Sequence, residues 1–139
     1  MKKWMNLLLS VSVLGLFTVS CLNDRDANAI EDIEMVKIDS VEVPETTMSA
    51  GDYQTIKTYS TLYNNCENFY GYDYQYSVLN RYITAYKFKT NTEDCGEEKA
   101  RSISFNFAPT EAGTYTMYFY AGKNASDEDT WITKTIVVE

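Results

Sequence analysis

The chain has 139 residues, of which 45% are hydrophobic and 14% aromatic, so it can form one domain with a substantial core and is not composed like a disordered protein. Lys2 and Lys3 are two of the 12 basic residues, so the chain from position 21 onward contains 10 basic residues and all 20 acidic residues. The formal charge of that part is −10. Such a surface repels nucleic-acid phosphates, so we expect no nucleic-acid partner.

Residues 1–20 have the organisation of a secretory signal peptide. Two lysines precede an apolar run from Leu7 to Phe17, and small residues follow it before Cys21. The apolar run is short for crossing a bilayer and is followed directly by the polar stretch LNDRD. A retained transmembrane helix is therefore the less favoured alternative.

Cys21 lies where bacterial lipoproteins are acylated. The stretch TVSC that ends at Cys21 resembles a lipobox, in which the peptidase cuts before a cysteine that carries diacylglycerol, although Thr18 stands where Leu is commoner. Ordinary cleavage at Thr18 and Ser20, or after Ala29, is the alternative. Lipidation predicts attachment to the membrane through an N-terminal lipid. Residues 21–32 are polar and predict an acidic flexible tether.

The chain has three cysteines. If Cys21 is acylated, Cys66 and Cys95 are the only pair left, and the oxidising environment of an exported protein favours a disulfide between them. Two cysteines in a chain without histidine cannot complete a tetrahedral zinc site. We therefore expect neither a metal nor another cofactor.

The domain at 33–139 shows short alternating runs separated by turn residues, without a helical apolar repeat, which predicts an all-β fold. Seven strands over this length are typical of an immunoglobulin-like sandwich. The predicted strands are 33–43, 52–62, 68–78, 81–89, 101–107, 114–121 and 130–138.

The segment from Phe107 to Met117 resembles the tyrosine corner of immunoglobulin-like domains, with Glu111, Gly113 and Tyr115 in the characteristic positions. The resemblance implies that the Tyr115 hydroxyl bonds to the corner backbone. Met117 stands where antibody domains have a core cysteine, so the disulfide must lie elsewhere.

With the lipobox and acidic tether, the whole chain resembles small lipoproteins of the Bacteroidetes with an immunoglobulin-like domain. In that group, acidic residues after the lipidated cysteine are associated with surface display, and CLNDRD is loosely similar. We therefore expect a lipid-anchored protein of the cell envelope, in the outer membrane, facing the periplasm or the exterior. The resemblance implies no particular activity.

Alternate residues from Tyr70 to Tyr76 are four tyrosines, which a strand would place on one face. If that face were outside, Asp73 and Gln75 would be buried, at a cost of about 1 to 3 kcal/mol for each unpaired group. We therefore expect the tyrosines mainly in the core, with a sugar-stacking platform as the alternative.

If Tyr115 and its alternate neighbours in the strand point inward, Tyr118 and Tyr120 must point outward. Trp131, on the next strand, is expected beside them. Exposed Trp and Tyr are common anchors of interfaces and sugar sites, so these three residues are the candidate ligand-binding set. Coverage of the rings by a loop or the tether is the alternative.

These features favour a lipid-anchored binding or structural module with a protein or glycan partner. An inhibitor or immunity protein that acts on an envelope enzyme is the alternative. A hydrolase that uses Glu97 and Glu98, or the acidic residues at 127–129, is less favoured because these loop carboxylates should be solvated. Without histidine, a histidine-dependent triad is excluded, and we expect no catalytic residue and no enzyme.

Overall fold

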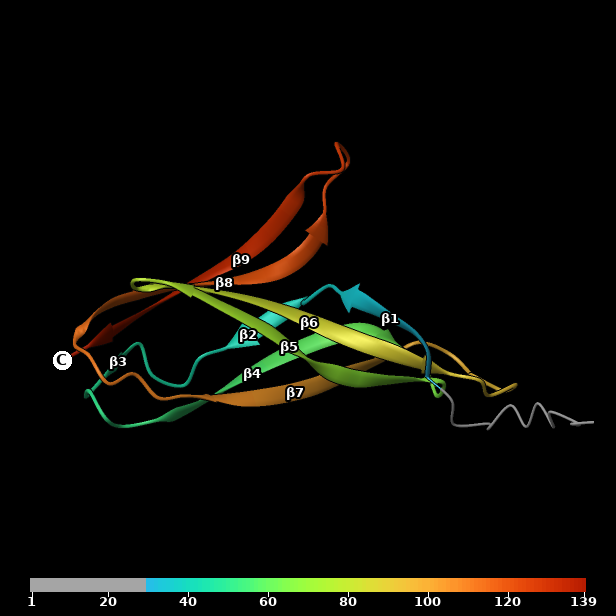
Figure 1. Cartoon of the computed structure of the whole chain (residues 1–139), viewed down its shortest axis with the longest axis horizontal. Coiled ribbons are helices and arrows are strands. Elements are labelled where there is room, and N and C mark those ends of the chain that lie inside the picture. Colours follow the sequence, from blue (N-terminus) through green and yellow to red (C-terminus); the bar gives the residue numbers. More distant parts are fainter. Residues whose placement is uncertain (1–29) are drawn as a thin grey trace, which may run out of the picture.

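The computed structural model of the chain describes residues 30–139. The predicted signal peptide, Cys21 and most of the predicted tether lie outside the described residues. All regular secondary structure in the described part consists of β-strands. No described segment is a helix that could cross a membrane. The nine strands are β1 (Ile30–Val36), β2 (Ser40–Glu42), β3 (Thr47–Met48), β4 (Gln54–Tyr63), β5 (Glu67–Ser77), β6 (Asn80–Thr90), β7 (Lys99–Phe107), β8 (Gly113–Lys123) and β9 (Asp129–Val138) (Figure 1).

The strands form two sheets, as the all-β prediction requires. The smaller sheet has the order β2-β4-β7. The larger sheet has the order β1-β6-β8-β9-β3, and β5 pairs with β6. Inward side chains of both sheets form one apolar core, whose fully buried members include Ile56, Ile83, Met117, Phe119 and Ile136.

The strand count is nine, not the predicted seven, chiefly because the predicted strand at 33–43 changes sheets. Its first part, β1, begins at Ile30 and pairs with β6, while β2 pairs with β4. At the crossing, the amide of Ile38 donates to Tyr120 O at 2.9 Å and that of Asp39 donates to Tyr59 O at 2.8 Å. The apolar alternation shifts phase at Asp39 and Ser40, from Val36 and Ile38 to Val41 and Val43, which marks the change of sheet that the prediction of one continuous strand overlooked. The second addition is the two-residue β3, which pairs with β9.

The larger sheet contains a parallel pair at its centre. Asn80–Ile83 of β6 pairs in parallel with Thr116–Phe119 of β8. The rest of β6, from Ala85 onward, pairs on that same side with β1 in place of β8, and Val36 lies opposite Ala85. The far ends of β8 and β9 therefore extend as a hairpin away from the rest of the protein (Figure 1).

The turn into β8 has the predicted corner geometry. The Tyr115 hydroxyl donates to the backbone carbonyl oxygen of Glu111 at 3.0 Å, and the ring of Tyr115 is buried. Gly113 has φ +153°, and a Cβ there would lie 2.9 Å from Leu79 Cδ1. The predicted hydrogen bond is confirmed, and Glu111 supplies its carbonyl to it.

The predicted disulfide is also confirmed. Cys66 precedes β5 and is bonded to Cys95 in the loop between β6 and β7. The amide of Asn65 donates to Cys95 O at 2.7 Å, so the backbone joins the same two segments. The bridge closes the end of the sandwich where β4 leads into β5.

The prediction that the tyrosine ladder lies mainly in the core is wrong. A β-bulge between Phe69 and Gly71 shifts the register, and Tyr70 is 57% exposed beside Phe88 on the outer face. Tyr72 points inward, and its hydroxyl lies 2.6 Å from Thr58 Oγ1. Tyr76 is 73% exposed. Because β5 is an edge strand and the smaller sheet has only three strands, the opposite layer does not cover its end.

Candidate functional site

Four aromatic side chains cluster on the outer face of the larger sheet, and we call them the aromatic platform: Tyr82, Tyr118, Tyr120 and Trp131. The rings of Tyr82 and Tyr118 are stacked, with centroids 4.9 Å apart and an interplanar angle of 12°. Trp131 stands nearly perpendicular to Tyr82, at 6.0 Å and 81°. The indole therefore lies edge-to-face with Tyr82 of the stacked pair.

Strand register explains why these residues share a face. Tyr82 of β6 lies opposite Tyr118 of β8, and Tyr120 lies opposite Trp131 of β9. Paired residues point to the same side of a sheet. The intervening Phe119 points inward and is fully buried. The inward position of Phe119 therefore directs its neighbours in β8 outward.

Exposure differs within the platform. Trp131 is 39% exposed and Tyr82 is 36% exposed, whereas Tyr118 is half-buried. The prediction that Tyr120 is an exposed ring is wrong, because Tyr120 is only 7% exposed and packs edge-on against Trp131 at 5.8 Å. Tyr120 thus supports the indole, and Tyr82 and Trp131 offer most of the accessible aromatic surface.

The predicted set lacked Tyr82, which the structure adds. The sequence feature that could have identified Tyr82 is its position next to Ile83, because Ile83 is buried in the core and its neighbour in the strand must point outward. That alternation placed Tyr82 outward but not beside Tyr118, since only the parallel pairing of β6 with β8 brings the two together.

The groups bordering the platform are polar, and they include the Asp73 carboxylate, whose Oδ2 accepts a hydrogen bond from Gln75 Nε2 at 2.7 Å. Gln75 of β5 lies opposite Tyr82, and Thr133 of β9 lies opposite Tyr118. Aromatic rings with amide and hydroxyl neighbours can stack against the apolar face of a sugar or against a partner's side chains, while the polar groups form hydrogen bonds. This arrangement suits binding.

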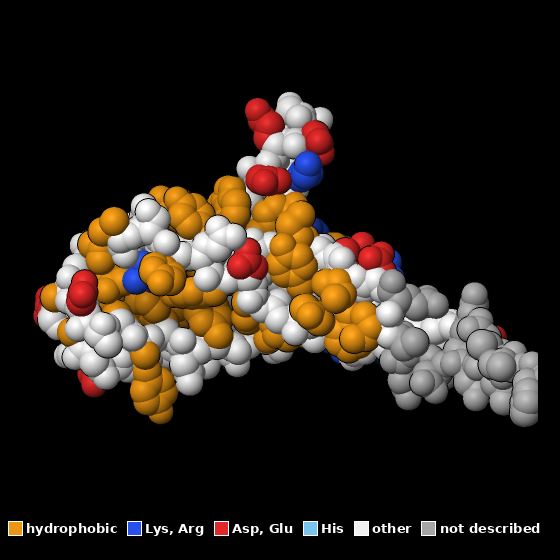
Figure 2. Space-filling view, viewed as in Figure 1, with side chains coloured by type: hydrophobic (Ala, Val, Ile, Leu, Met, Phe, Trp, Pro, Cys, Tyr) orange, Lys and Arg blue, Asp and Glu red, His pale blue; other side chains and the backbone are white. Residues whose placement is uncertain are grey.

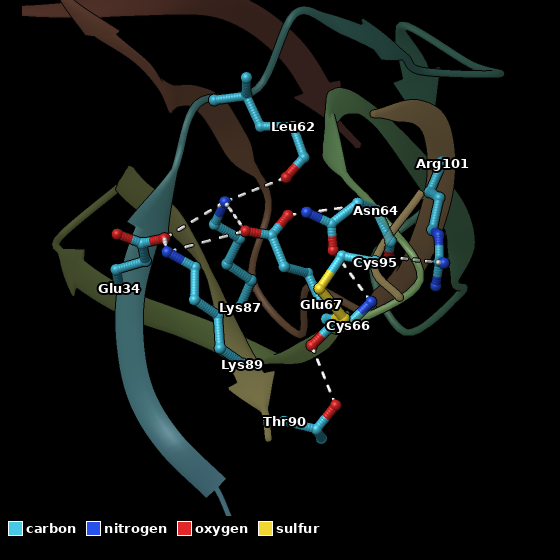
Figure 3. A network of polar contacts seen from close by, with 10 residues as sticks. All are labelled: Glu34, Leu62, Asn64, Cys66, Glu67, Lys87, Lys89, Thr90, Cys95 and Arg101. Carbon is cyan, nitrogen blue, oxygen red and sulfur yellow. Dashed lines mark hydrogen bonds and ion pairs between the residues drawn. A yellow bond between two sulfur atoms is a disulfide. The ribbon is translucent and has the colours of Figure 1, made fainter. Parts of the chain in front are cut away.

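The most buried charged groups form a separate network beside the disulfide (Figure 3). Lys87 Nζ lies 2.7 Å from Glu67 Oε1, 3.0 Å from Leu62 O and 3.3 Å from Glu34 Oε1. Lys89 also pairs with Glu34, at 3.0 Å, and this hydrogen bond holds the pKa of Glu34 below its usual value. An ammonium has three donors, and three acceptors surround Lys87. The network therefore joins strands and leaves no donor of Lys87 for a substrate.

The acidic loops show no catalytic arrangement. Glu97 and Glu98 are exposed between β6 and β7. In the turn between β8 and β9, Asp127 pairs with Lys123 at 3.1 Å and Glu128 accepts a hydrogen bond from Asn124 at 2.9 Å. Within residues 30–139, no three His, Cys, Asp or Glu side chains are grouped to hold a metal ion.

Comparisons of the chain with protein-family models, curated proteins and solved structures found no match. The candidate site is therefore defined by its geometry. That geometry places Tyr118 and Trp131 of the predicted set in one cluster, adds Tyr82 to them and packs the buried Tyr120 edge-on against the indole.

Proposed function

We propose that this protein is a non-catalytic, lipid-anchored binding module of the bacterial cell envelope that engages a protein or glycan through the aromatic platform. The observation that carries this proposal is the perpendicular arrangement of Trp131 and the stacked Tyr82–Tyr118 pair on the outer face of the larger sheet, where Trp131 is 39% and Tyr82 is 36% exposed. Partly exposed Trp and Tyr side chains are common binding hot spots. A nucleic-acid partner is disfavoured by the negative charge.

The localisation part of the proposal rests on Cys21 and on the compartment that the disulfide favours. A bond between Cys66 and Cys95 persists in an oxidising compartment, in keeping with export. Cys21→Ala should abolish palmitate labelling and release the protein from the membrane fraction. A wild-type protein without an acyl group by mass spectrometry would contradict lipidation.

We also propose that the fold is a variant of the immunoglobulin-like sandwich. The Tyr115 corner and the antiparallel pairing of β4 with β7 support this assignment. The parallel pairing of β6 with β8 departs from the antiparallel sheets of that fold. An experimental structure that lacks the corner hydrogen bond would remove the main support for the assignment.

Trp131 provides a direct test of the platform. The chain contains two tryptophans, and the proposed cleavage before Cys21 removes Trp4, so all tryptophan fluorescence of the mature protein comes from Trp131. Envelope polysaccharides that bind the platform should change this fluorescence and protect it from acrylamide quenching. If the partner is a protein, a photo-crosslinking amino acid at Thr133, on the same face, should capture it in cells.

Matched variants decide whether such binding uses the platform. Tyr82→Ser or Trp131→Ser should weaken binding by over about 1 kcal/mol. Tyr53→Ser serves as the control, because Tyr53 is 69% exposed but lies outside the platform. Binding that survives both platform substitutions, or that Tyr53→Ser lowers equally, would contradict the proposal.

A further inference from the structure

A hollow opens between the sheets where the β5–β6 turn faces the chain that follows β7. It is a cleft of about 580 Å³. Hydrophobic side chains gather over this end of the face seen in Figure 2. The lining includes Tyr74, Tyr76, Arg81, Phe105, Glu111 and Tyr115. Its residues are separate from the aromatic platform, and its volume is that of a small-molecule site.

Arg81 is the central group of the cleft. Its guanidinium carbon lies 4.8 Å from the ring centroid of Tyr115 and 5.6 Å from that of Tyr76. Its Nη1 donates to the carbonyls of Val78 at 2.8 Å and Asn80 at 2.9 Å. These bonds and the rings fix the guanidinium in one orientation, and both bonds use only one of its nitrogens.

This cation has no anionic partner in the described part of the chain. Arg81 forms no salt bridge within residues 30–139, although acidic residues outnumber basic ones in the protein. Arg81 is also the only basic residue lining the cleft. A guanidinium with free N–H groups, held among aromatic rings, is suited to pair with a planar carboxylate through two hydrogen bonds.

The charge of the rest of the lining favours a ligand with a single negative charge over one with several. Glu111 is the one acidic residue of the cleft, and the protein as a whole is negative, so phosphate dianions and polyanions are repelled. The same carboxylate can accept a hydrogen bond from a ligand hydroxyl. Asn106 and Thr110 add further polar groups to the rim.

The aromatic walls indicate what carries the carboxylate. Tyr76 is highly exposed and Tyr74 is partly exposed. The ring centroids of Phe105 and Tyr74 are 6.0 Å apart. Exposed rings can stack on the C–H face of a pyranose, whose hydroxyls then reach polar groups at the rim. We infer that this cleft binds an acidic sugar, with its carboxylate on Arg81 and its ring against Tyr76.

The inference can be tested by saturation-transfer NMR on the full-length protein in detergent micelles. The probes are glucuronic acid and N-acetylneuraminic acid, which present the same carboxylate on two sugar types, with glucose as the neutral counterpart. Both acids, or one of them, should bind at least about tenfold more tightly than glucose. Arg81→Gln should weaken binding of the acid by a similar factor, and Arg81→Lys should restore it only in part because lysine lacks the planar fork.

Further variants separate this cleft from the platform and from misfolding. Tyr76→Ala should weaken binding of the acid without lowering the melting temperature, because that side chain is 73% exposed. Trp131→Ser should leave binding of the acid unchanged, whatever its effect at the platform. Equal binding of glucose, no binding of either acid, or full binding by folded Arg81→Gln would overturn the inference. Tighter binding of a short peptide through its C-terminal carboxylate would also overturn it.

Discussion

Lys87 Nζ lies 2.7 Å from Glu67 Oε1 inside the protein, and the two side chains are 9% and 5% exposed. Lys87 lies on β6 and Glu67 begins β5, and the bonds of Lys87 to Glu34 and Leu62 extend the contact to β1 and the end of β4. Four strands therefore meet at one ammonium group. A buried charge is tolerated when it is paired and hydrogen-bonded, so each partner depends on the other.

Removal of one member of the Lys87–Glu67 pair should lower the free energy of unfolding more than removal of both. Lys87→Met leaves the Glu67 carboxylate buried without its closest cation, and we expect a loss of about 3 to 5 kcal/mol in the free energy of unfolding. The double variant Lys87→Met, Glu67→Leu should recover most of that loss. Urea denaturation measures both values. A double variant no more stable than Lys87→Met would show that the pair is not coupled in this way.

The disulfide should stabilise the domain through the loop that it closes. Cys66 and Cys95 are 29 residues apart, and the chain-entropy model gives about 3 to 4 kcal/mol for a loop of this size. Replacement of both cysteines by serine should lower the free energy of unfolding by this amount and also the melting temperature. Labelling of the unfolded, unreduced wild-type protein should find neither thiol reactive, and modification of both would contradict the bond.

Tyr63 should make stability depend on pH in the alkaline range. Its hydroxyl is buried without a hydrogen bond within the described residues, and burial raises its pKa from 10.0 to about 12. The neutral form is favoured in the folded state, so its contribution to stability is complete below pH 10 and is lost as the pH rises through about 12. Tyr63→Phe should remove this contribution to the dependence of the free energy of unfolding on pH.

At neutral pH, Tyr63→Phe should stabilise the protein by about 1 kcal/mol, because it removes an unsatisfied buried polar group. Thermal unfolding at several pH values provides the measurement. Tyr53→Phe is the control, since its exposed ring should change neither the slope nor the melting temperature. A destabilised Tyr63→Phe would indicate that the hydroxyl has a partner.

The incomplete cover over β5 predicts different effects at the inner and outer ends of the tyrosine ladder. Tyr72 packs against Phe105 at 5.2 Å and bonds to Thr58, so Tyr72→Ser should cost about 2 to 5 kcal/mol, like other large-to-small changes in a core. Tyr76→Ser should cost little because the ring is largely in solvent. Chemical denaturation distinguishes them, and equal losses would place both rings in the core.

Tyr115→Phe isolates the corner hydrogen bond from the packing of the ring. The variant retains the buried ring but leaves Glu111 O without this donor, and we expect a loss of about 1 kcal/mol. Tyr115→Ser should cost several times more because it also opens a cavity. Thermal unfolding of the two variants gives the comparison, and equal effects would mean that the hydroxyl contributes nearly all of the stabilisation.

Local patterns in the sequence predicted the features that depend on neighbours along the chain. Alternating side chains and turn residues placed most strands within two residues of their observed bounds. The corner was predictable because Tyr115 and Glu111 are four residues apart, and a short turn brings them together. The cysteine count indicated the bond between Cys66 and Cys95, once Cys21 was assigned to lipidation.

Only the tertiary structure decided which distant strands meet and where one layer stops covering the other. Alternation states that Tyr82 and Tyr118 each point outward, but only the parallel pairing of β6 with β8 stacks them. The sequence argument placed Tyr76 in the core because it assumed an opposing layer along all of β5, whereas β5 lies at an edge. A strand's period of two determines which residues share a face. Burial of that face depends on long-range packing, which the period does not contain.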